Sequence, residues 1–458
     1  MPNIKKISIA IVCLLAALFF TSCNRNSTYP MFWTWLDYHE GVNFDSLCQV
    51  MQDAGIDGVM LNAPSPDDYR KAIPLAHKHG ITVYAWLWTM NLEHGRDSIV
   101  KAHPEWLCVN RKGQSLADTT AYVDYYKFLC PALPEVRQYI LGKIEDYCNI
   151  DGLDGIAIDY HRMVDVVLPT TLWDNYGIKQ DREYAEWDYG YHPDMIRIFK
   201  EKYGYDPRDQ KDPSLDDKWR QFRCDQISEV ANLIAETVHK YGKKMAASPF
   251  PTPKMASRMV RQDWSKWNLD IVFPMVYHNF YTEDVNFISD CMIEDVRDKQ
   301  PQTTLYCGIM ADNTNDLFAA MHNAFDSGAQ GIAIFTVNDL KTPEMIKRFR
   351  EFTEIWRKRR KHSGKIEPII TAQKADTDLM THYGLMEKII HKACKLKNIS
   401  YTDDNNPLHF SAADMKLIES YDAHKKYLVF PNDKNRSFIL NIYLYGDVIS
   451  GWSVENNE

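Results

Sequence analysis

The sequence lacks several short motifs that are typical of common metal and nucleotide chemistries. No CxxC pair occurs among its ten cysteines, which argues against a zinc ribbon and a dense disulfide framework. No HExxH is present, and no GxGxxG follows the first apolar segment, so neither a zincin nor a dinucleotide-binding fold is indicated. We therefore expect no cofactor and assign no metal ligand.

Positive charge is also in short supply. Lys and Arg number 53 against 62 Asp and Glu, which gives a formal net charge of −9, and no basic stripe appears. Nucleic acid is therefore not an expected partner. The expected final strands lack a glycine-rich phosphate loop, which argues against phosphorylated substrates. The chain has many aromatic residues, with 12 Trp and 26 Tyr, and these suit both core packing and stacking against sugars.

The longest N-terminal apolar run, 9–20, is too short to cross a bilayer comfortably. Two lysines precede it, and it ends in Phe-Thr-Ser-Cys, which resembles a bacterial lipoprotein box with Phe in place of the usual Leu. This order predicts a lipoprotein signal peptide over 1–22, a lipidated Cys23 and a tether over 23–30. The protein would then be anchored by lipid in the bacterial cell envelope. An ordinary cleaved signal with a coincidental cysteine is the alternative.

Strand and helix patterns alternate along 31–361. Eight apolar segments bounded by turn residues predict strands at 31–38, 56–63, 81–90, 152–159, 243–248, 269–277, 303–312 and 329–337. Amphipathic patterns predict helices at 44–54, 65–80, 134–150, 219–241, 255–267, 316–327 and 343–361. Eight such units in order predict an α/β fold, the closed (β/α)8 TIM barrel, with an open doubly wound sheet as the alternative.

The pattern changes after residue 361. A helical segment at 376–397 is followed by alternating segments at 426–430 and 437–445. These features predict a small α+β domain over 362–458, which is a plausible domain size.

The stretch 152–162, GLDGIAIDYHR, carries the first candidate for a working carboxylate. Its apolar run stops at Asp159, at the carboxyl end of the expected fourth strand, where parallel α/β proteins place their chemistry. Period-2 alternation puts Asp159 on the same face as Ala157 and Gly155, which we take as the barrel interior. A structural role, as a helix cap or a partner of Arg162, is the alternative.

Polar residues end seven of the eight expected strands, and a barrel would gather them at one mouth. Carboxylates, amides and indoles in one cup suit a carbohydrate, because one acid can protonate the leaving oxygen while a second attacks or activates water. For the second carboxylate we choose Asp312, with Glu40 and Asp339 in reserve. The expected substrate-binding residues are Asp37, His39, Asn62, Trp86, Trp88, Tyr160, His161, Arg162, Tyr277, His278, Asn279, Asn338 and Asp339.

Three segments carry a resemblance to a known family. HPEWLCVNRKG (103–113), FLCPALPEVRQYI (128–140) and LDGIAIDYHR (153–162) resemble motifs of the glycosyl-hydrolase-like family 10 proteins. The resemblance covers roughly 31–356, and it implies a TIM barrel acting on carbohydrate with Asp159 as the strand-four acid. The last segment also resembles the DGxDxDxE strand of family-18 chitinases. There His161 stands in place of their acidic Glu, which removes the residue that their chemistry needs.

Three functions remain open at this point. The first is a retaining or inverting glycosidase on an envelope-tethered barrel. The second is a glycan-binding barrel without hydrolysis, because no Glu ends the fourth, fifth or sixth strand. The third is a metal-dependent hydrolase that would use Asp159, His161 and His278.

Overall fold

The computed structural model describes the barrel almost completely and the C-terminal region in part. The described residues are 29–39, 41–282, 284–312, 316–363, 389–390, 392–394, 396–397, 415–421, 424–429, 437–445 and 448–456. The predicted signal peptide, Cys23, Glu40 and most of the helix expected at 376–397 lie outside these residues.

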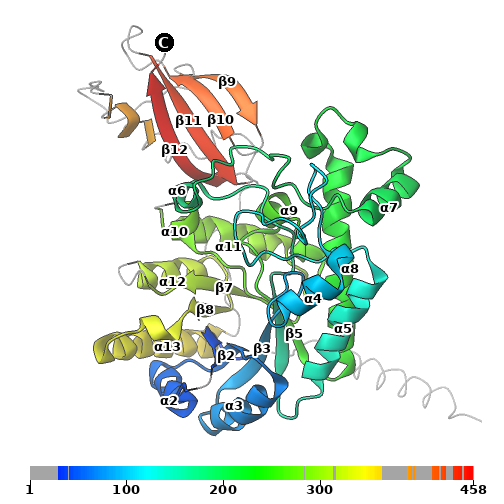
Figure 1. Ribbon diagram of the computed structural model, residues 1–458. Coiled ribbons are helices and arrows are strands. Elements are labelled where there is room, and N and C mark those ends of the chain that lie inside the picture. Colours follow the sequence, from blue (N-terminus) through cyan, green and yellow to red (C-terminus); the bar gives the residue numbers. More distant parts are fainter. Residues whose placement is uncertain are drawn as a thin grey trace, which may run out of the picture.

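Eight parallel strands close into a barrel in chain order, which confirms the predicted (β/α)8 TIM barrel (Figure 1). The last strand pairs with the first, with Trp33 opposite Ala333, and this pairing excludes the open sheet. The strands are β1 (Phe32–Asp37), β2 (Gly58–Asn62), β3 (Thr82–Trp88), β4 (Gly155–Asp159), β5 (Lys244–Ala247), β6 (Ile271–Val272), β7 (Thr304–Met310) and β8 (Gly331–Phe335).

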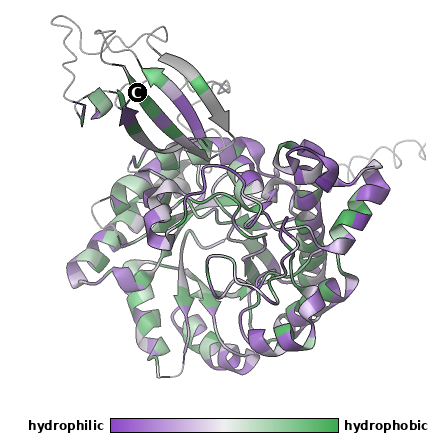
Figure 2. Cartoon of the chain, turned by 45° about the horizontal axis from the view of Figure 1, so that its top comes forward, coloured by the Kyte–Doolittle hydropathy of each residue, from purple (hydrophilic) through white to green (hydrophobic). Residues whose placement is uncertain are grey.

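Helices surround the barrel, and they are striped with hydrophilic and hydrophobic residues (Figure 2). They are α2 (Phe44–Ala54), α3 (Pro66–Lys78), α4 (Arg96–Ala102), α5 (Pro134–Cys148), α6 (Trp173–Tyr176), α7 (Pro193–Tyr203), α8 (Asp217–Lys240), α9 (Pro253–Val260), α10 (His278–Tyr281), α11 (Phe287–Asp298), α12 (Leu317–Asp326) and α13 (Pro343–Ser363). Local signals set many of their ends. Ser65 caps α3 by accepting from the Asp68 amide, and Gly55 ends α2 with a φ of 79°.

Two predicted elements are shorter than expected. β6 covers only Ile271–Val272, because Pro274 has no N–H to continue the ladder and the chain turns into α10. The helix expected at 255–267 ends at Val260, where Arg261 takes a left-handed φ of 60°. A short 3₁₀ turn, Trp264–Lys266, follows it.

Large aromatic side chains fill the barrel interior, and small residues on the neighbouring strands leave space for them. Trp33, Tyr84, Phe273 and Tyr306 form one buried cluster with Ala157 of β4. A Cβ at Gly155 would lie 2.8 Å from the Tyr84 ring, so only glycine fits there. The predicted placement of the small-residue face of β4 toward the interior is therefore confirmed.

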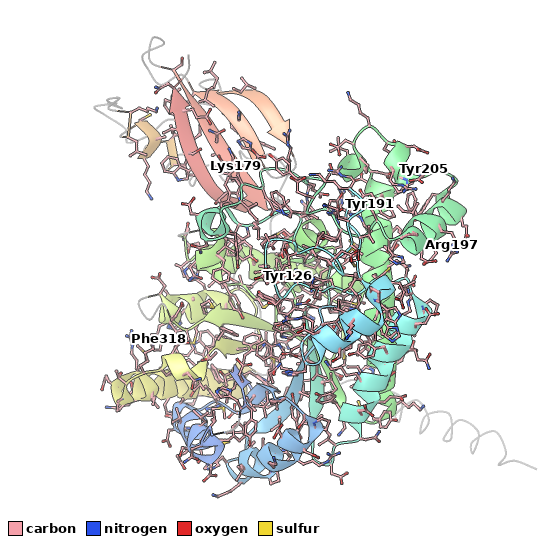
Figure 3. All side chains as sticks on the ribbon, in the orientation of Figure 1. Tyr126, Lys179, Tyr191, Arg197, Tyr205 and Phe318 are labelled. Atoms are coloured by element: carbon pink, nitrogen blue, oxygen red, sulfur yellow. The ribbon has the colours of Figure 1, made fainter. Side chains whose placement is uncertain are left out.

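An antiparallel sheet follows the barrel near the end of the chain. It contains β9 (Met415–Tyr421), β10 (His424–Val429), β11 (Phe438–Tyr445) and β12 (Val448–Asn456), in the order β12-β11-β10-β9. The sheet lies beside α6 and α10 (Figure 1), where the rings of Trp173 and Tyr443 are 4.8 Å apart. Lys179 lies at the foot of this sheet (Figure 3). Among the residues that the structure describes, no helix has the length and apolar character needed to span a membrane.

Candidate active site

Asp159 ends β4 with a side chain that is almost fully enclosed, at 5% exposure. Its Oδ2 accepts a hydrogen bond of 2.9 Å from Trp86 Nε1, and its Oδ1 accepts one of 2.6 Å from the Tyr160 amide. Burial raises the pKa of Asp159 to about 6, although both hydrogen bonds and the charge of Arg162 act in the opposite direction. This carboxyl group can therefore change protonation state close to neutral pH.

The turn after Asp159 is held in an uncommon conformation. Tyr160 has a φ of 47°, which is rare for an aromatic residue and is found most often at functional sites. Its ring lies against Trp88, with ring centroids 4.1 Å apart, and the Arg162 guanidinium lies 4.9 Å from its ring centroid. These contacts stabilise the uncommon conformation of the turn, and in this conformation the Tyr160 amide points at the Asp159 carboxylate.

A second acid, Glu93, acts on Asp159. Its side chain is 15% exposed, and its Oε1 accepts a hydrogen bond of 2.6 Å from Asn62 Nδ2. Burial and the nearby charge of Asp37 raise the pKa of Glu93, and Glu93 in turn raises the pKa of Asp159. Carboxyl groups from the ends of β1 and β4 and from the loop after β3 therefore interact at one mouth.

Sequence analysis overlooked Glu93. It selected Trp86 and Trp88 from this strand, whereas Glu93 lies in the connection that follows β3. The sequence did contain a signal for it: Glu93 follows the polar Asn91 by two residues, just after the strand that carries Trp86 and Trp88.

Aromatic rings surround the Asp159 carboxylate. Trp35 lies 6.4 Å from Tyr277, Tyr277 lies 5.9 Å from Phe335, and Phe335 lies 6.3 Å from Trp86, measured between ring centroids. Burial raises the pKa of Tyr277, and the Asp159 charge adds to this increase, which places the Tyr277 hydroxyl within electrostatic reach of the acid. The rings account for the desolvation of the acid and provide flat surfaces for a sugar.

The other predicted mouth residues divide into two groups. Asp37 and Asn62 belong to the acid cluster through their interactions with Glu93. His39 and Asn338 are exposed, and Asn279 is half-buried. Asp339 accepts a hydrogen bond of 3.1 Å from the Thr336 amide and so caps the 3₁₀ turn Val337–Asp339.

Asp312, chosen from sequence as the second carboxylate, is exposed and acts electrostatically on His278. His278 Nε2 also lies 3.8 Å from Asp316 Oδ2, and burial lowers the pKa of this histidine. The structure therefore associates Asp312 with the loops after β6 and β7, whereas Glu93 is the acid that influences Asp159.

His161 is fully buried behind β4, at 0% exposure. Its Nε2 faces the Ile227 carbonyl of α8 at 2.9 Å and must donate, so Nδ1 accepts from Thr89 Oγ1 at 2.9 Å. Burial lowers the pKa of His161 to about 4, so the ring is neutral near pH 7. A ligand in the mouth cannot reach it, and we correct its sequence-based assignment from substrate binding to the structural frame.

Arg162 is likewise enclosed. It donates to Asp165 Oδ2 at 3.1 Å and to Tyr126 Oη at 3.0 Å. Tyr126 lies near the middle of the molecule (Figure 3). We therefore assign Arg162 to positioning of the turn at Tyr160 instead of direct substrate contact.

The residues expected to share a metal in the third hypothesis do not gather. Across the described ranges, no three His, Cys, Asp or Glu side chains are arranged to hold a metal ion. Both ring nitrogens of His161 already have partners inside the protein.

The closed parallel barrel carries Trp88 and Asp159 at the carboxyl ends of β3 and β4. The model of the family "Glycosyl hydrolase-like 10" matches residues 51–322, more than half of the chain. The chain belongs to this family, which confirms the resemblance seen in the sequence.

Comparisons with individual proteins find only distant similarity. No curated protein matches the chain. A GH20 exo-β-N-acetylglucosaminidase from Vibrio harveyi is 10% identical with a TM-score of 0.40, over 82% of this chain and 60% of that chain. An α-amylase from Geobacillus thermoleovorans is 10% identical with a TM-score of 0.39, over 90% and 86%. The glycoside hydrolase domain of PelA from Pseudomonas aeruginosa is 10% identical with a TM-score of 0.38, over 68% and 97%. The chain therefore spans less than two thirds of the V. harveyi enzyme.

Proposed function

We propose that the protein is a glycoside hydrolase that cleaves a poly- or oligosaccharide with Asp159 and Glu93 as its two carboxyl groups. The observation that carries this proposal is the chain of hydrogen bonds between them: Trp86 Nε1 donates to Asp159, and Asn62 Nδ2 donates both to the Trp86 carbonyl at 3.3 Å and to Glu93. Burial also raises the pKa of each acid. Two interacting carboxyl groups lose their protons in separate steps, so one can stay protonated while the other is charged. Glycoside hydrolysis needs one acid in each state.

The hydrogen bonds assign the two roles. Two N–H donors, from Trp86 and Tyr160, hold Asp159 in place and favour its charged form. Asp159 is therefore the carboxylate that attacks the anomeric carbon or activates water. Glu93 accepts from one N–H donor, Asn62, and is more exposed, so we assign it the other role, in which its protonated form donates to the leaving glycosidic oxygen.

Substitution of each acid tests this assignment. We expect Asp159→Asn and Glu93→Gln to lower the release of reducing sugar from a responsive polysaccharide by about 10²–10⁴-fold while glycan affinity survives. Asp312→Asn is the matched control, and we expect it to keep most of the activity. A fully active Asp159→Asn variant would show that the catalytic assignment is wrong, and an inactive Asp312→Asn with an active Glu93→Gln would restore the sequence-based choice of Asp312.

The same assays separate the alternative functions. Binding of a glycan by the wild-type protein with no cleavage across a broad panel would favour the glycan-binding barrel. Activity lost to a chelator and restored by a divalent metal would favour the metal-dependent hydrolase. The metal-dependent hydrolase is less well supported, because both ring nitrogens of His161 are already hydrogen-bonded, to Thr89 and to the Ile227 carbonyl, and cannot serve as metal ligands.

We also propose that the barrel is tethered to the bacterial cell envelope through a lipid on Cys23. The proposal rests on the two lysines, the apolar run and the cysteine box at the start of the sequence. Metabolic labelling with palmitate tests it. The wild-type protein should carry label and sediment with membranes, whereas Cys23→Ser should lose both properties, and equal labelling of the two would refute the anchor.

A further inference from the structure

A cavity of about 480 Å³ lies between the loop that follows β3 and the loop that follows β4. Its walls come from residues 110–127 and 186–189, and none of the acids of the candidate active site lines it. Its volume is typical of small-molecule sites. We propose that this cavity is a second carbohydrate site, which binds a neutral sugar unit of the polysaccharide that the candidate active site cleaves.

Hydrogen bonds within the protein hold the walls of the cavity in place, so the cavity is preformed. Asn110 Nδ2 donates to the Glu186 carbonyl at 2.9 Å, and its Oδ1 accepts from the amides of Lys112 at 3.0 Å and Gln114 at 2.9 Å. One buried amide side chain therefore joins both walls. Beneath it, Asp188 is fully buried against Arg223 at 2.5 Å, which fixes the second wall from below. A preformed site loses little conformational entropy on binding.

Several side chains that line the cavity can bind a sugar and its hydroxyl groups. Trp187 is half-buried, so part of its indole faces the cavity and part packs on Tyr184. Within the described part of the chain, neither the Trp187 Nε1 nor the Gln114 Nε2 nor the Thr120 hydroxyl has a hydrogen-bond partner. An indole face beside an amide donor and a hydroxyl matches the alternating apolar and polar surface of a pyranose.

The charges of the lining favour a neutral ligand. The Lys127 ammonium group donates to the carbonyls of Leu116 at 2.6 Å and Thr119 at 3.1 Å, so it is already engaged. Glu186 pairs with Lys112 at 3.2 Å, and the carboxylate of Asp118 also lines the cavity. The charges of Lys127 and Asp118 already offset each other, so the lining carries no surplus positive charge that would favour an acidic sugar. A purely apolar ligand would leave these polar groups without hydrogen bonds.

The site lies within reach of the candidate active site along one loop. Segment 119–127 supplies Thr119 and Lys127 to the cavity and also carries Tyr125, whose ring lies 5.9 Å from that of Trp88. Trp88 in turn contacts Tyr160, next to Asp159. A saccharide that occupies both places would cross this aromatic surface. The inference of a shared polysaccharide rests on the proposed function, whereas sugar binding in the cavity does not.

Calorimetric titration of the non-cleaving Asp159→Asn protein tests the proposal. The probes are neutral tetrasaccharides of glucose, xylose, mannose and N-acetylglucosamine, together with acidic tetragalacturonate. We expect two binding events for at least one neutral probe. Trp187→Ala should weaken one event roughly tenfold, the loss of about one stacking contact, and Trp86→Ala should weaken the other.

Trp106→Ala is the matched control, because Trp106 is half-buried in the connection after β3, which forms the other wall, but stacks on His103, with centroids 3.9 Å apart, outside the cavity. Trp187→Phe keeps a ring and should keep part of the affinity, which separates stacking from misfolding. Two unchanged events in Trp187→Ala, a single event in the parent protein, or preference of this site for tetragalacturonate would overturn the proposal. Hydrolysis that survives Asp159→Asn would instead overturn the proposed function and leave the Trp187 result standing.

Discussion

The indole of Trp86 donates a hydrogen bond of 2.9 Å to the carboxylate of Asp159, and the two residues lie on neighbouring strands of the barrel. The strand register places Trp86 opposite Ala157 and Trp88 opposite Asp159. Trp86 lies two residues before Trp88 in β3, so its indole extends along the barrel toward the mouth to contact Asp159. This link ties the protonation of the acid to an aromatic wall of the site.

Removal of the indole donor should raise the pKa of Asp159. An N–H bond to a carboxylate stabilises the charged form, so Trp86→Phe should move the acidic limb of the kcat/KM profile to higher pH by about one unit, the effect of roughly 1.4 kcal/mol. The measurement is kcat/KM between pH 4 and 8 for both proteins. An unchanged acidic limb with lower activity would mean that Trp86 acts only by packing.

Asp159 should also make the stability of the protein depend on pH. Its pKa is about 6 in the folded protein against an ordinary value of 3.8 for an aspartate, so the folded state binds more protons between these values. The stability contribution therefore falls as pH rises from about 4 to about 6, by at most about 3 kcal/mol. Urea unfolding of the wild type and Asp159→Asn should show the variant gaining relative stability over this range. A pH-independent difference between them would contradict the assignment.

His161 should matter for stability and not for substrate affinity. Its replacement by Ala leaves the Ile227 carbonyl and the Thr89 hydroxyl without their partner and opens a buried space, which should cost about 2–4 kcal/mol of unfolding free energy. Chemical denaturation measures this loss, and calorimetric titration measures glycan affinity. If a folded variant binds glycan more weakly, His161 contributes to substrate binding and its structural assignment is wrong.

The buried ion pairs behind the second carbohydrate site should be costly to break. Arg223 donates to Asp188 and Arg261 donates to Glu183, each at 2.5 Å, and all four side chains are nearly inaccessible. Arg223→Met leaves the Asp188 charge buried with less compensation and should cost about 3–5 kcal/mol.

The matched control is Arg197→Met, which breaks solvent-exposed pairs with Asp194 and Glu201. We expect it to cost under about 1 kcal/mol. Equal losses of unfolding free energy in the two variants would show that burial does not decide the cost.

Much of the barrel could be predicted from local patterns. The helix at 44–54 matches α2 at both ends, because Asn43 and Gly55 are strong caps. The strand expected at 152–159 matches the end of β4 at Asp159. The strand predicted at 269–277 is present but shorter, because Pro274 interrupts the ladder after Val272.

The candidate site was harder to predict than the fold. Asp159 was found because the end of an apolar strand is a sequence signal. Glu93 was missed because it lies in a loop, and its interaction with Asn62 requires the loop to fold back over β2. His161 was misplaced because strand alternation stops at Asp159, where β4 ends, and the turn at Tyr160, with its φ of 47°, brings the histidine against α8.

By itself, the sequence determined the order of strands and helices and the position of Asp159 at a strand end, and it predicted the parallel barrel that the pairing of β1 with β8 confirms. Periodicity and capping act over a few residues, so they can be read without coordinates. Only the tertiary structure decided which acid interacts with Asp159 and which polar side chains are enclosed. Those outcomes depend on contacts between segments far apart in the chain, such as Trp86 with Asp159 and His161 with Ile227, and such contacts exist only once the barrel has closed.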